Sequence, residues 1–340
     1  MRNKKIWIPI ALLLCALVCV AAGCTPAGDG DPKTQFVYID ASERALDAES
    51  ATYANVIERV QDSVVEIATS SGAGSGVILN ADGLIVTNHH VIENADAVAV
   101  KTTDGVEYAA NIVGSDRKSD LAVLQIQAHD LTYAIIGDSE QTRVGERVLA
   151  IGNPLGTLGG SASEGIISAQ KRNISVDGLP MQLMQTTAAI NPGNSGGGLF
   201  NMSGQLIGIV NAKSTGIDVE GIGFAIPTDT AIPIVEELVS NGYIAGRPSL
   251  GVTVQFRNAG LSVYPVVIGV NDLQTSGLQV GDILYSIDNT VYTSAAAMQA
   301  YLLGAYNAGD TCNVTVIRGN EGTYTQIKLQ VKLIDAHENL

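Results

Sequence analysis

Short apolar runs, separated by glycine, asparagine and aspartate, recur along most of the chain. Between residues 63 and 227 about ten such runs follow one another, among them VVEIAT, GLIVTN and ERVLAIG. Apolar runs of this length with turn residues between them predict β-strands rather than helices. We therefore expect an all-β region that forms a pair of closed barrels.

Helical periodicity is confined to a few segments. Residues 228–241 carry apolar residues at helical spacing, with Thr228 as the candidate N-cap and a glycine after the last turn. We expect a short helix over residues 54–61 and a linker over the segment GYIAGRPS, 242–249. Beyond it, several strand patterns and one helical stretch, 294–306, share about 85 residues. This mixture predicts a small α+β module.

The N-terminus resembles the leader of a bacterial lipoprotein. A basic start precedes the uncharged apolar segment 6–22, and small residues lead to Cys24. We expect residues 1–23 to be a signal peptide, Cys24 to be lipidated, and residues 24–48 to connect the membrane to the folded part. The alternative is an uncleaved anchor, because 17 apolar residues reach the lower edge of spanning length. Both interpretations place the remaining chain outside the cytoplasm and tethered to a membrane.

Charge and cysteine content argue against several classes of function. The formal net charge is −15, or −18 without the three basic residues of the leader, which disfavours binding to nucleic acid. Only Cys312 lies beyond residue 24, so an intramolecular disulfide cannot form in the folded part. The four histidines show no ligand spacing to a cysteine or to an acidic cluster. We expect neither a metal nor a cofactor.

The glycine-rich stretch AAINPGNSGGGLF, 188–200, surrounds a single serine, Ser195. A serine hydroxyl becomes a nucleophile when a base takes its proton, and peptide N–H groups in a glycine turn can bind the oxyanion that forms. The amides of Gly193 and Ser195 are candidates for such an oxyanion hole. The stretch therefore suggests nucleophilic catalysis, and the rest of the chain must supply a base and an acid.

The stretch LIVTNHHVI offers His89 and His90 as the base, unless both histidines only face solvent in a turn. Two aspartates follow. Asp116 lies among serine, arginine and lysine and is expected in a solvated loop, whereas Asp120 directly precedes an apolar run, where a carboxylate needs a partner. A histidine, an aspartate and a serine in this order, separated by 30 and 75 residues, have the order and spacing found in a two-barrel serine peptidase.

Four motifs in the correct order resemble the HtrA/DegP family of serine proteases. TNHHV resembles the family's Thr-Asn-x-His-Val, which implies His90 as the base and leaves His89 in the variable place. SDLAVL resembles Asp-Leu-Ala-Val-Leu and implies Asp120. AAINPGNSGGGL implies Ser195, and GIGFAIP, 221–227, is a further family motif.

This resemblance covers about residues 50–335 and implies a mostly β architecture. A chymotrypsin-like protease domain of two six-stranded β-barrels is expected over residues 49–242. A small α+β PDZ domain is expected over residues 248–335. The family also forms trimers through aromatic residues ahead of the first barrel, for which Phe36 and Tyr38 are the local candidates.

The resemblance extends to the substrate pocket. In trypsin-like barrels the residue six positions before the nucleophile lies at the base of the primary pocket, and here this residue is Ala189, followed by Ile190. An uncharged pocket of this kind implies small or medium aliphatic residues before the cleaved bond. Lys213 is expected along the pocket wall, either as a charge at the rim or as a limit on side-chain length.

Two regulatory features are implied as well. The segment SLGV stands at the family's carboxylate-binding loop, so the backbone of Leu250, Gly251 and Val252 is expected to bind peptide C-termini while the peptide adds as a strand. SAQKRN aligns with the family's sensor loop, in which Arg172 would relay occupancy of the PDZ domain or of an activator to the oxyanion loop. The other interpretation of Arg172 is a solvated basic turn.

The sequence thus predicts a membrane-tethered, extracytoplasmic serine endopeptidase that degrades unfolded or damaged proteins. The rival hypothesis is a chaperone-like, peptide-binding scaffold with weak or regulated proteolysis. The complete set of His90, Asp120 and Ser195 favours the peptidase.

Overall fold

The computed structural model describes most of the chain beyond residue 51. The described ranges are 52–70, 72–152, 161–176, 179–191, 193–212, 221–259, 262–271, 273, 275–320 and 323–339. Several residues of the predictions lie outside these ranges. They are the predicted leader, the expected lipidation site Cys24, the aromatic residues Phe36 and Tyr38, and the expected pocket residue Lys213. Within these ranges, no helix has the length and apolar character required to cross a membrane.

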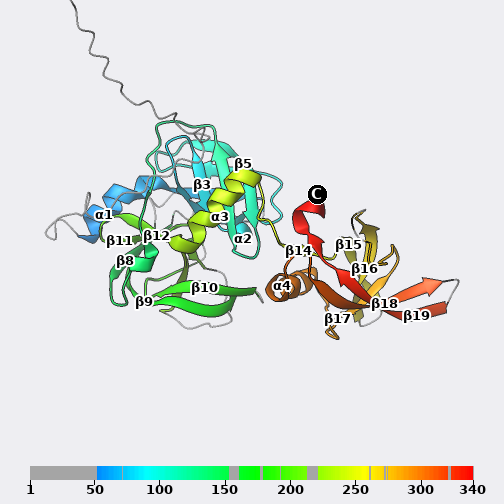
Figure 1. Cartoon of the computed structure of the whole chain (residues 1–340). Helices are drawn as coiled ribbons and strands as arrows, with labels where there is room; N and C mark the ends of the chain where they lie inside the picture. Colours follow the sequence, from blue (N-terminus) through cyan, green and yellow to red (C-terminus); the bar gives the residue numbers. More distant parts are fainter. Residues whose placement is uncertain are drawn as a thin grey trace, which may run out of the picture.

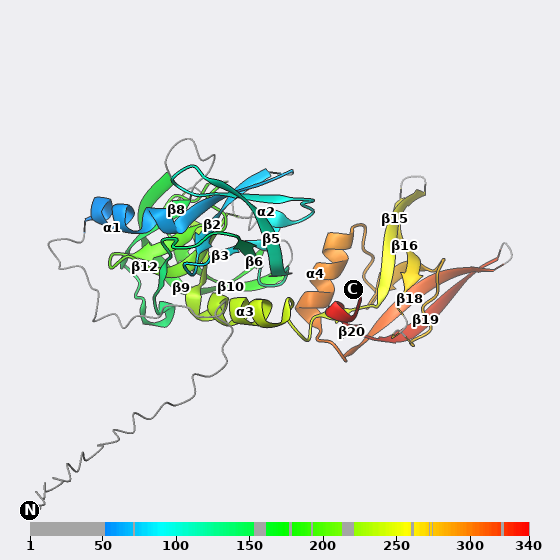
Figure 2. The ribbon, with the colours of Figure 1, turned by 90° about the horizontal axis from the view of Figure 1, so that it is seen from above.

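The described residues form a larger β-rich domain and a smaller C-terminal module that follows it (Figures 1 and 2). The larger domain begins with helix α1 (Tyr53–Val60) and ends with helix α3 (Thr228–Asn241). We call it the two-barrel domain. The C-terminal module comprises residues 248–339.

Six antiparallel strands close the first barrel in the order β1-β2-β3-β6-β5-β4. A four-residue helix, α2 (His89–Ile92), follows the third of them. The strands are β1 (Val64–Thr69), β2 (Gly72–Ile78), β3 (Leu84–Thr87), β4 (Val98–Lys101), β5 (Glu107–Asp116) and β6 (Leu121–Ile126).

Six further strands close the second barrel, because β11 pairs with both β8 and β12. They are β8 (Arg147–Gly152), β9 (Ser161–Val176), β10 (Leu179–Thr186), β11 (Gly198–Asn201), β12 (Gln205–Asn211) and β13 (Gly223–Pro227). A two-residue strand, β7 (Ile135–Ile136), is added in parallel to β12. The expected pair of six-stranded barrels is confirmed, although β7, β10 and β11 do not stand out as strands in the sequence.

Strands β3, β6 and β13 have apolar residues on both faces because both faces are buried. In β6, Ala122 and Leu124 belong to the cluster inside the first barrel, whereas Leu121 and Val123 belong to a second cluster outside it. Side chains alternate between the two faces of a strand, so burial of both faces produces a continuous apolar run. This is the pattern that marks the strands in the sequence.

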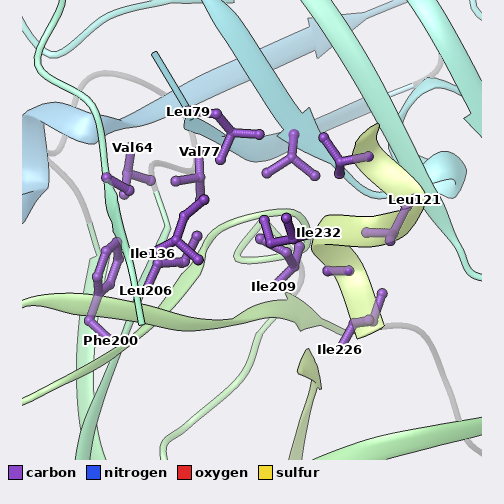
Figure 3. Close-up of a cluster of buried hydrophobic side chains, with 14 of the residues drawn as sticks. Val64, Val77, Leu79, Leu121, Ile136, Phe200, Leu206, Ile209, Ile226 and Ile232 are labelled. Atoms are coloured by element: carbon purple, nitrogen blue, oxygen red, sulfur yellow. The ribbon is translucent and has the colours of Figure 1, made fainter. Parts of the chain in front are cut away.

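The second cluster lies where the two barrels meet, and it joins them. Figure 3 shows Val77 and Leu79 of the first barrel near Leu206 and Ile209 of the second, with Ile232 of α3 beside them. Burial of large aliphatic side chains contributes about 1.5–3 kcal/mol each, so this shared cluster contributes strongly to the docking of the barrels.

Helix α3 closes the two-barrel domain, with one difference from the sequence prediction. Its N-cap is Pro227, and Thr228, the expected cap, is instead the first helical residue. The Thr228 hydroxyl donates to the carbonyl of Gly137 at 2.8 Å, which lies outside the helix. At the other end Gly242 adopts a left-handed conformation with φ of 81°, as the glycine in the sequence predicts.

The C-terminal module contains a five-stranded sheet in the order β15-β16-β17-β18-β19, which leaves β15 at one edge. A short pair, β14–β20, joins its first and last segments. Its elements are β14 (Pro248–Ser249), β15 (Val252–Ala259), β16 (Ser262–Val270), β17 (Ile283–Ile287), α4 (Ala295–Ala305), β18 (Thr311–Asn320), β19 (Thr323–Lys332) and β20 (Ile334–Asp335). The expected α+β module is confirmed.

Asp116 is not in a solvated loop, and the expectation from the sequence is wrong for this residue. Its side chain is only 5% exposed and pairs with Arg247 of the linker, whose Nε and Nη2 donate to the two carboxylate oxygens at 2.8 and 2.6 Å. The Ser119 hydroxyl adds a third donor at 2.6 Å. Burial alone would raise the pKa of Asp116, but Arg247 and Ser119 hold it below its ordinary value.

The linker lies close against the first barrel. A Cβ atom at Gly114 would lie 2.4 Å from the carbonyl oxygen of Gly242, so only glycine permits this approach. A second contact joins the C-terminal module to the second barrel, where Leu179 of β10 is buried with Ala300 and Leu303 of α4. The linker is therefore packed against the first barrel, and the module against the second.

Replacement of Asp116 by asparagine should destabilise the protein. Removal of one partner from a buried ion pair typically costs about 3 kcal/mol or more, because the other charge is left without compensation. Since the pKa of Asp116 is lowered in the folded state, its contribution is complete at neutral pH and is lost as the pH falls through that lowered value. We expect a clear loss of free energy of unfolding for Asp116→Asn in chemical denaturation followed by circular dichroism.

The matched control is Asp104→Asn, since Asp104 lies in an exposed turn of the same barrel. Equal denaturation curves for the two variants would contradict a stabilising role of the Asp116–Arg247 pair.

Candidate active site

His90, Asp120 and Ser195 lie within hydrogen-bond distance of one another where the barrels meet. His90 Nδ1 is 2.7 Å from Asp120 Oδ2, and His90 Nε2 is 3.0 Å from Ser195 Oγ. The histidine and the aspartate come from the first barrel and the serine from the second. The structure therefore brings together the three residues that the sequence predicts as base, acid and nucleophile.

Local hydrogen bonds tie the histidine helix α2 to the turn that carries Asp120. The carbonyl oxygen of Asp120 accepts from the His89 amide at 3.1 Å and from Asn88 Nδ2 at 3.0 Å. Asp120 itself has a φ of 54°, in the left-handed region, which aspartate adopts more readily than most residues. Asp120 lies in the turn between the end of β5 and the start of β6.

The Asp120 side chain is 5% exposed, and its carboxylate is well supplied with donors. Besides the His90 ring, it accepts from the His90 amide at 3.0 Å and from Asn211 Nδ2 at 2.9 Å. Asn211 ends β12 in the second barrel, so the acid is held from both barrels. The motifs in the sequence did not identify Asn211, although a polar residue at the end of an apolar run was a signal.

The loop around Ser195 needs its glycines for close approach. Gly193 and Gly196 have φ of 101° and 82°, which few other residues adopt without strain. A Cβ atom at Gly196 would lie 2.2 Å from the carbonyl oxygen of Ser75, in strand β2 of the first barrel. Ser195 is 6% exposed, and its Oγ also lies 3.1 Å from the Ala212 amide.

Comparison with known proteins agrees with this geometry. Residues 74–209 match the trypsin-like peptidase domain, and residues 248–329 match the PDZ domain. The chain is 38% identical over 292 residues to the serine protease Do-like HtrA of Bacillus subtilis, covering 78% of this chain and 65% of that protein. It is 40% identical over 283 residues to the serine protease Do-like HtrA of Lactobacillus helveticus, covering 76% and 68%. The chain belongs to the HtrA family of serine proteases.

Solved structures of HtrA-type proteases have the same fold. The chain shares 34% identity and a TM-score of 0.53 with the HtrA-type protease AlgW with tripeptide, covering 84% of this chain and 97% of that one. The serine endoprotease from Yersinia pestis gives the same identity, the same TM-score and 98% coverage of its chain. This chain spans 65% of the Bacillus subtilis relative and 41% of a periplasmic DegP-like relative from Rickettsia prowazekii.

The residues expected to form the HtrA substrate pocket directly follow β10. Ala189 is exposed, and its carbonyl accepts from Ser163 Oγ at 2.7 Å. Ile190 is half-buried beside Gly223, where a Cβ atom would lie 2.4 Å from Ile190 Cγ1. Neither residue brings a charge to the expected pocket. Lys213, which was expected along its wall, lies outside the described residues.

His89 does not contact Ser195, although it is adjacent to His90 in the sequence. It lines a cavity of about 450 Å³ between the two-barrel domain and the PDZ domain, and its Nε2 is 4.0 Å from Glu93 Oε1. Burial lowers the pKa of His89, although the carboxylates of Glu93 and Asp120 act in the opposite direction. This placement separates the two histidines and agrees with His90 as the base.

The segment around Arg172 is a strand rather than the loop that we expected. β9 and β10 form one long hairpin in which Arg172 pairs with Leu183, and Arg172 Nε donates to Gln185 Oε1 at 3.2 Å. The pairing continues to Leu179, which contacts α4 of the PDZ domain. The hairpin that carries Arg172 therefore touches the PDZ domain directly.

The expected carboxylate-binding loop lies beside α4, at the start of the edge strand β15. Leu250 is buried, and Gly251 has a φ of 66° while its amide donates to Ser249 Oγ at 3.1 Å. Leu250 and Val252 line the same 450 Å³ cavity as His89. Across the described ranges, no three histidine, cysteine, aspartate or glutamate side chains are grouped as metal ligands would be.

Proposed function

We propose that the protein is a serine endopeptidase in which Ser195 is the nucleophile, His90 the general base and Asp120 the acid that orients the base. The observation that carries this proposal is the continuous chain of contacts from Asp120 Oδ2 through the His90 ring to Ser195 Oγ, at 2.7 and 3.0 Å. Both distances are within the range required for proton transfer.

Each group has a defined part in the reaction. Ser195 Oγ attacks the carbonyl carbon of the substrate peptide while His90 Nε2 takes the hydroxyl proton. Asp120 holds the proton on His90 Nδ1, so that Nε2 is free to accept, and stabilises the imidazolium that forms. The amides of Gly193 and Ser195 bind the oxyanion of the tetrahedral intermediate. His90 then protonates the leaving amine, and water releases the acyl group by the same steps in reverse order.

A chaperone-like scaffold with weak or regulated proteolysis is the second candidate. The buried carboxylate of Asp120 argues for catalysis, because its donors include the His90 ring and Asn211, which come from different barrels. A scaffold has no need for a serine, a histidine and an aspartate aligned in this way. Binding of unfolded chains can accompany cleavage, and the two activities are separable by removing the nucleophile.

We further propose that the substrates are unfolded or damaged polypeptides and that the PDZ domain binds peptide C-termini. Three features support the binding of peptide C-termini by the PDZ domain. They are the free edge of β15, the buried Leu250 at its start and the apolar side chains of α4 across the cavity. An extended peptide can add to such an edge as a further strand. Contact between α4 and the β9–β10 hairpin gives a physical route by which binding there would reach Arg172.

Membrane tethering through Cys24 and trimer formation through Phe36 and Tyr38 stay predictions from the sequence. Relatives named as periplasmic endoproteases support an extracytoplasmic location. For the lipid anchor, we expect the protein to incorporate labelled palmitate and Cys24→Ala to lose this label. For the trimer, we expect light scattering to give a trimeric mass that is lost in Phe36→Ala. An unlabelled full-length protein, or a monomeric parent protein, would contradict the respective prediction.

Removal of a triad residue should abolish casein digestion. Loss of one triad member typically lowers the rate by roughly 10⁴-fold or more, since the residues act as one unit. We expect this loss for Ser195→Ala and His90→Ala, and a severe loss for Asp120→Asn, each with an unchanged circular dichroism spectrum. The measurement is digestion of casein by the protein without its leader.

His89→Ala is the matched control, because it removes the neighbouring imidazole and should leave digestion near the parent level. Undiminished digestion by Ser195→Ala would refute the peptidase. Equal losses for His89→Ala and His90→Ala would overturn the assignment of the base.

The bonds that are cleaved should follow small or medium aliphatic residues. An apolar pocket distinguishes one methylene group by only about 1–3 kcal/mol, so valine, alanine, isoleucine and threonine should all be accepted. A lysine or arginine side chain beside Ala189 and Ile190 would meet no carboxylate from either residue, so its charge would give up water without gaining a partner, which is more costly. Mass spectrometry of casein fragments tests this directly. A majority of cuts after lysine or arginine would show that the pocket contains an acid.

A further inference from the structure

Ser75, in strand β2 of the first barrel, makes two hydrogen bonds to the nucleophile loop of the second barrel. Its amide donates to the carbonyl oxygen of Ser195 at 2.8 Å. Its hydroxyl donates to the carbonyl oxygen of Gly193 at 2.6 Å, across 118 positions of sequence. One residue thus holds the carbonyl groups on both sides of Asn194.

The surroundings of Ser75 are built for this contact. Gly74 and Gly76 flank it, and a Cβ atom at either position would lie 2.7 Å from a side-chain carbon, of Val91 or of Ile85. Gly152 leaves room on the other side, where a Cβ atom would lie 3.0 Å from the Ser75 hydroxyl. Small neighbours therefore let β2 approach the loop until the Ser75 hydroxyl bridges the gap.

The residues whose carbonyl groups are held are those whose amides form the proposed oxyanion hole. The amide and the carbonyl group of Gly193 lie on either side of one Cα atom, and glycine has no side chain that restricts rotation about it. Gly193 alone therefore does not hold its amide in one orientation. The Ser75 hydroxyl fixes the adjoining peptide plane, between residues 193 and 194, and so removes one of the movements by which the loop could reorient the Gly193 amide. Oxyanion donors act through such preorganisation, because they need not reorient during the reaction.

We propose that Ser75 is a positioning residue for the oxyanion hole, and that its hydroxyl, by fixing the peptide plane next to the Gly193 amide, keeps this amide in the orientation that binds the transition state. This proposal rests on the proposed function of Ser195 as the nucleophile. Ser75 does not touch the substrate or the reacting atoms and acts through Gly193.

Ser75 also connects the oxyanion hole to the base. The Thr87 hydroxyl donates to the carbonyl oxygen of Ser75 at 2.7 Å, and Thr87 ends β3, directly before the turn into the helix that carries His90. The strand before the base and the loop of the nucleophile are thus joined through one buried residue. The oxyanion hole therefore forms only when the two barrels are correctly docked.

The test is Ser75→Ala, with Ser63→Ala as a matched control. Both serines are buried, at 0% and 1% exposure, and both hydroxyls donate to a backbone carbonyl at 2.6 Å, but Ser63 bonds to Val60 at the end of α1, away from the triad. Loss of a direct oxyanion donor lowers kcat by about 10²–10³-fold, so misorientation of one donor should cost less. We expect kcat of Ser75→Ala to fall about 10–100-fold with KM almost unchanged, and no such fall for Ser63→Ala.

A second readout separates positioning from general damage. A peptide boronic acid forms a tetrahedral adduct on serine that resembles the transition state, whereas the product peptide binds as a ground state. The affinity of Ser75→Ala for the boronic acid should fall by the same factor as kcat/KM, while its affinity for the product peptide is retained. The acid limb of the pH–rate profile should keep its midpoint, because the His90–Asp120 contact is intact.

The outcomes are distinct. A kcat for Ser75→Ala within twofold of that for Ser63→Ala, or an equal loss of affinity for boronic acid and product peptide, would overturn the proposal. If Ser75→Ala does not fold, Ser75→Cys keeps a donor at this position, although a weaker one on a larger atom, and should show the same pattern. Ser195→Ala is measured in parallel, and full activity of that variant would refute the peptidase itself rather than the role of Ser75.

Discussion

The docking of the two barrels on one shared apolar cluster is the constraint on which the proposed active site depends. His90 and Asp120 come from the first barrel, whereas Ser195 and Asn211 come from the second, so no barrel holds the site alone. The cluster holds the barrels together but does not determine their relative orientation, since apolar burial is not directional. Hydrogen bonds that cross the interface, from Asn211 to Asp120 and from Ser75 to the nucleophile loop, then define how the residues of the site are oriented.

The contacts of the PDZ domain reach the same site from outside. The Asp116–Arg247 pair anchors the linker to the turn that leads to Asp120, and within this turn the Asp120 amide bonds to the Arg117 carbonyl group. The packing of α4 on the β9–β10 hairpin forms the other anchor. Movement of the PDZ domain would therefore act on both barrels. Mutation of either anchor would test whether the PDZ domain and the triad are coupled.

Local sequence predicted the triad, but it could not show partners that are distant in the chain. Ser195 and His90 lie in motifs that can be recognised by the glycines and apolar residues around them. The apolar runs in the sequence likewise predict the strands of the two barrels. Asp116 was misjudged because Arg247, which makes its burial possible, lies 131 positions away. Ser75 carried no signal of its own, since the Gly193 carbonyl is 118 positions distant. Strand β10 has Thr186 as its one β-branched residue, whereas such residues mark most other strands, and its partners β9 and β13 hold it in the sheet.

The most direct test of the account is the site of covalent labelling by a fluorophosphonate probe, located by peptide mass spectrometry. Such probes react with a serine only where a base and an oxyanion hole activate its hydroxyl. The docked barrels should direct the label to Ser195 alone, and labelling should cease when the protein is unfolded in denaturant. A label on another serine, or none on the folded protein, would contradict the claim that barrel docking creates an activated nucleophile at Ser195.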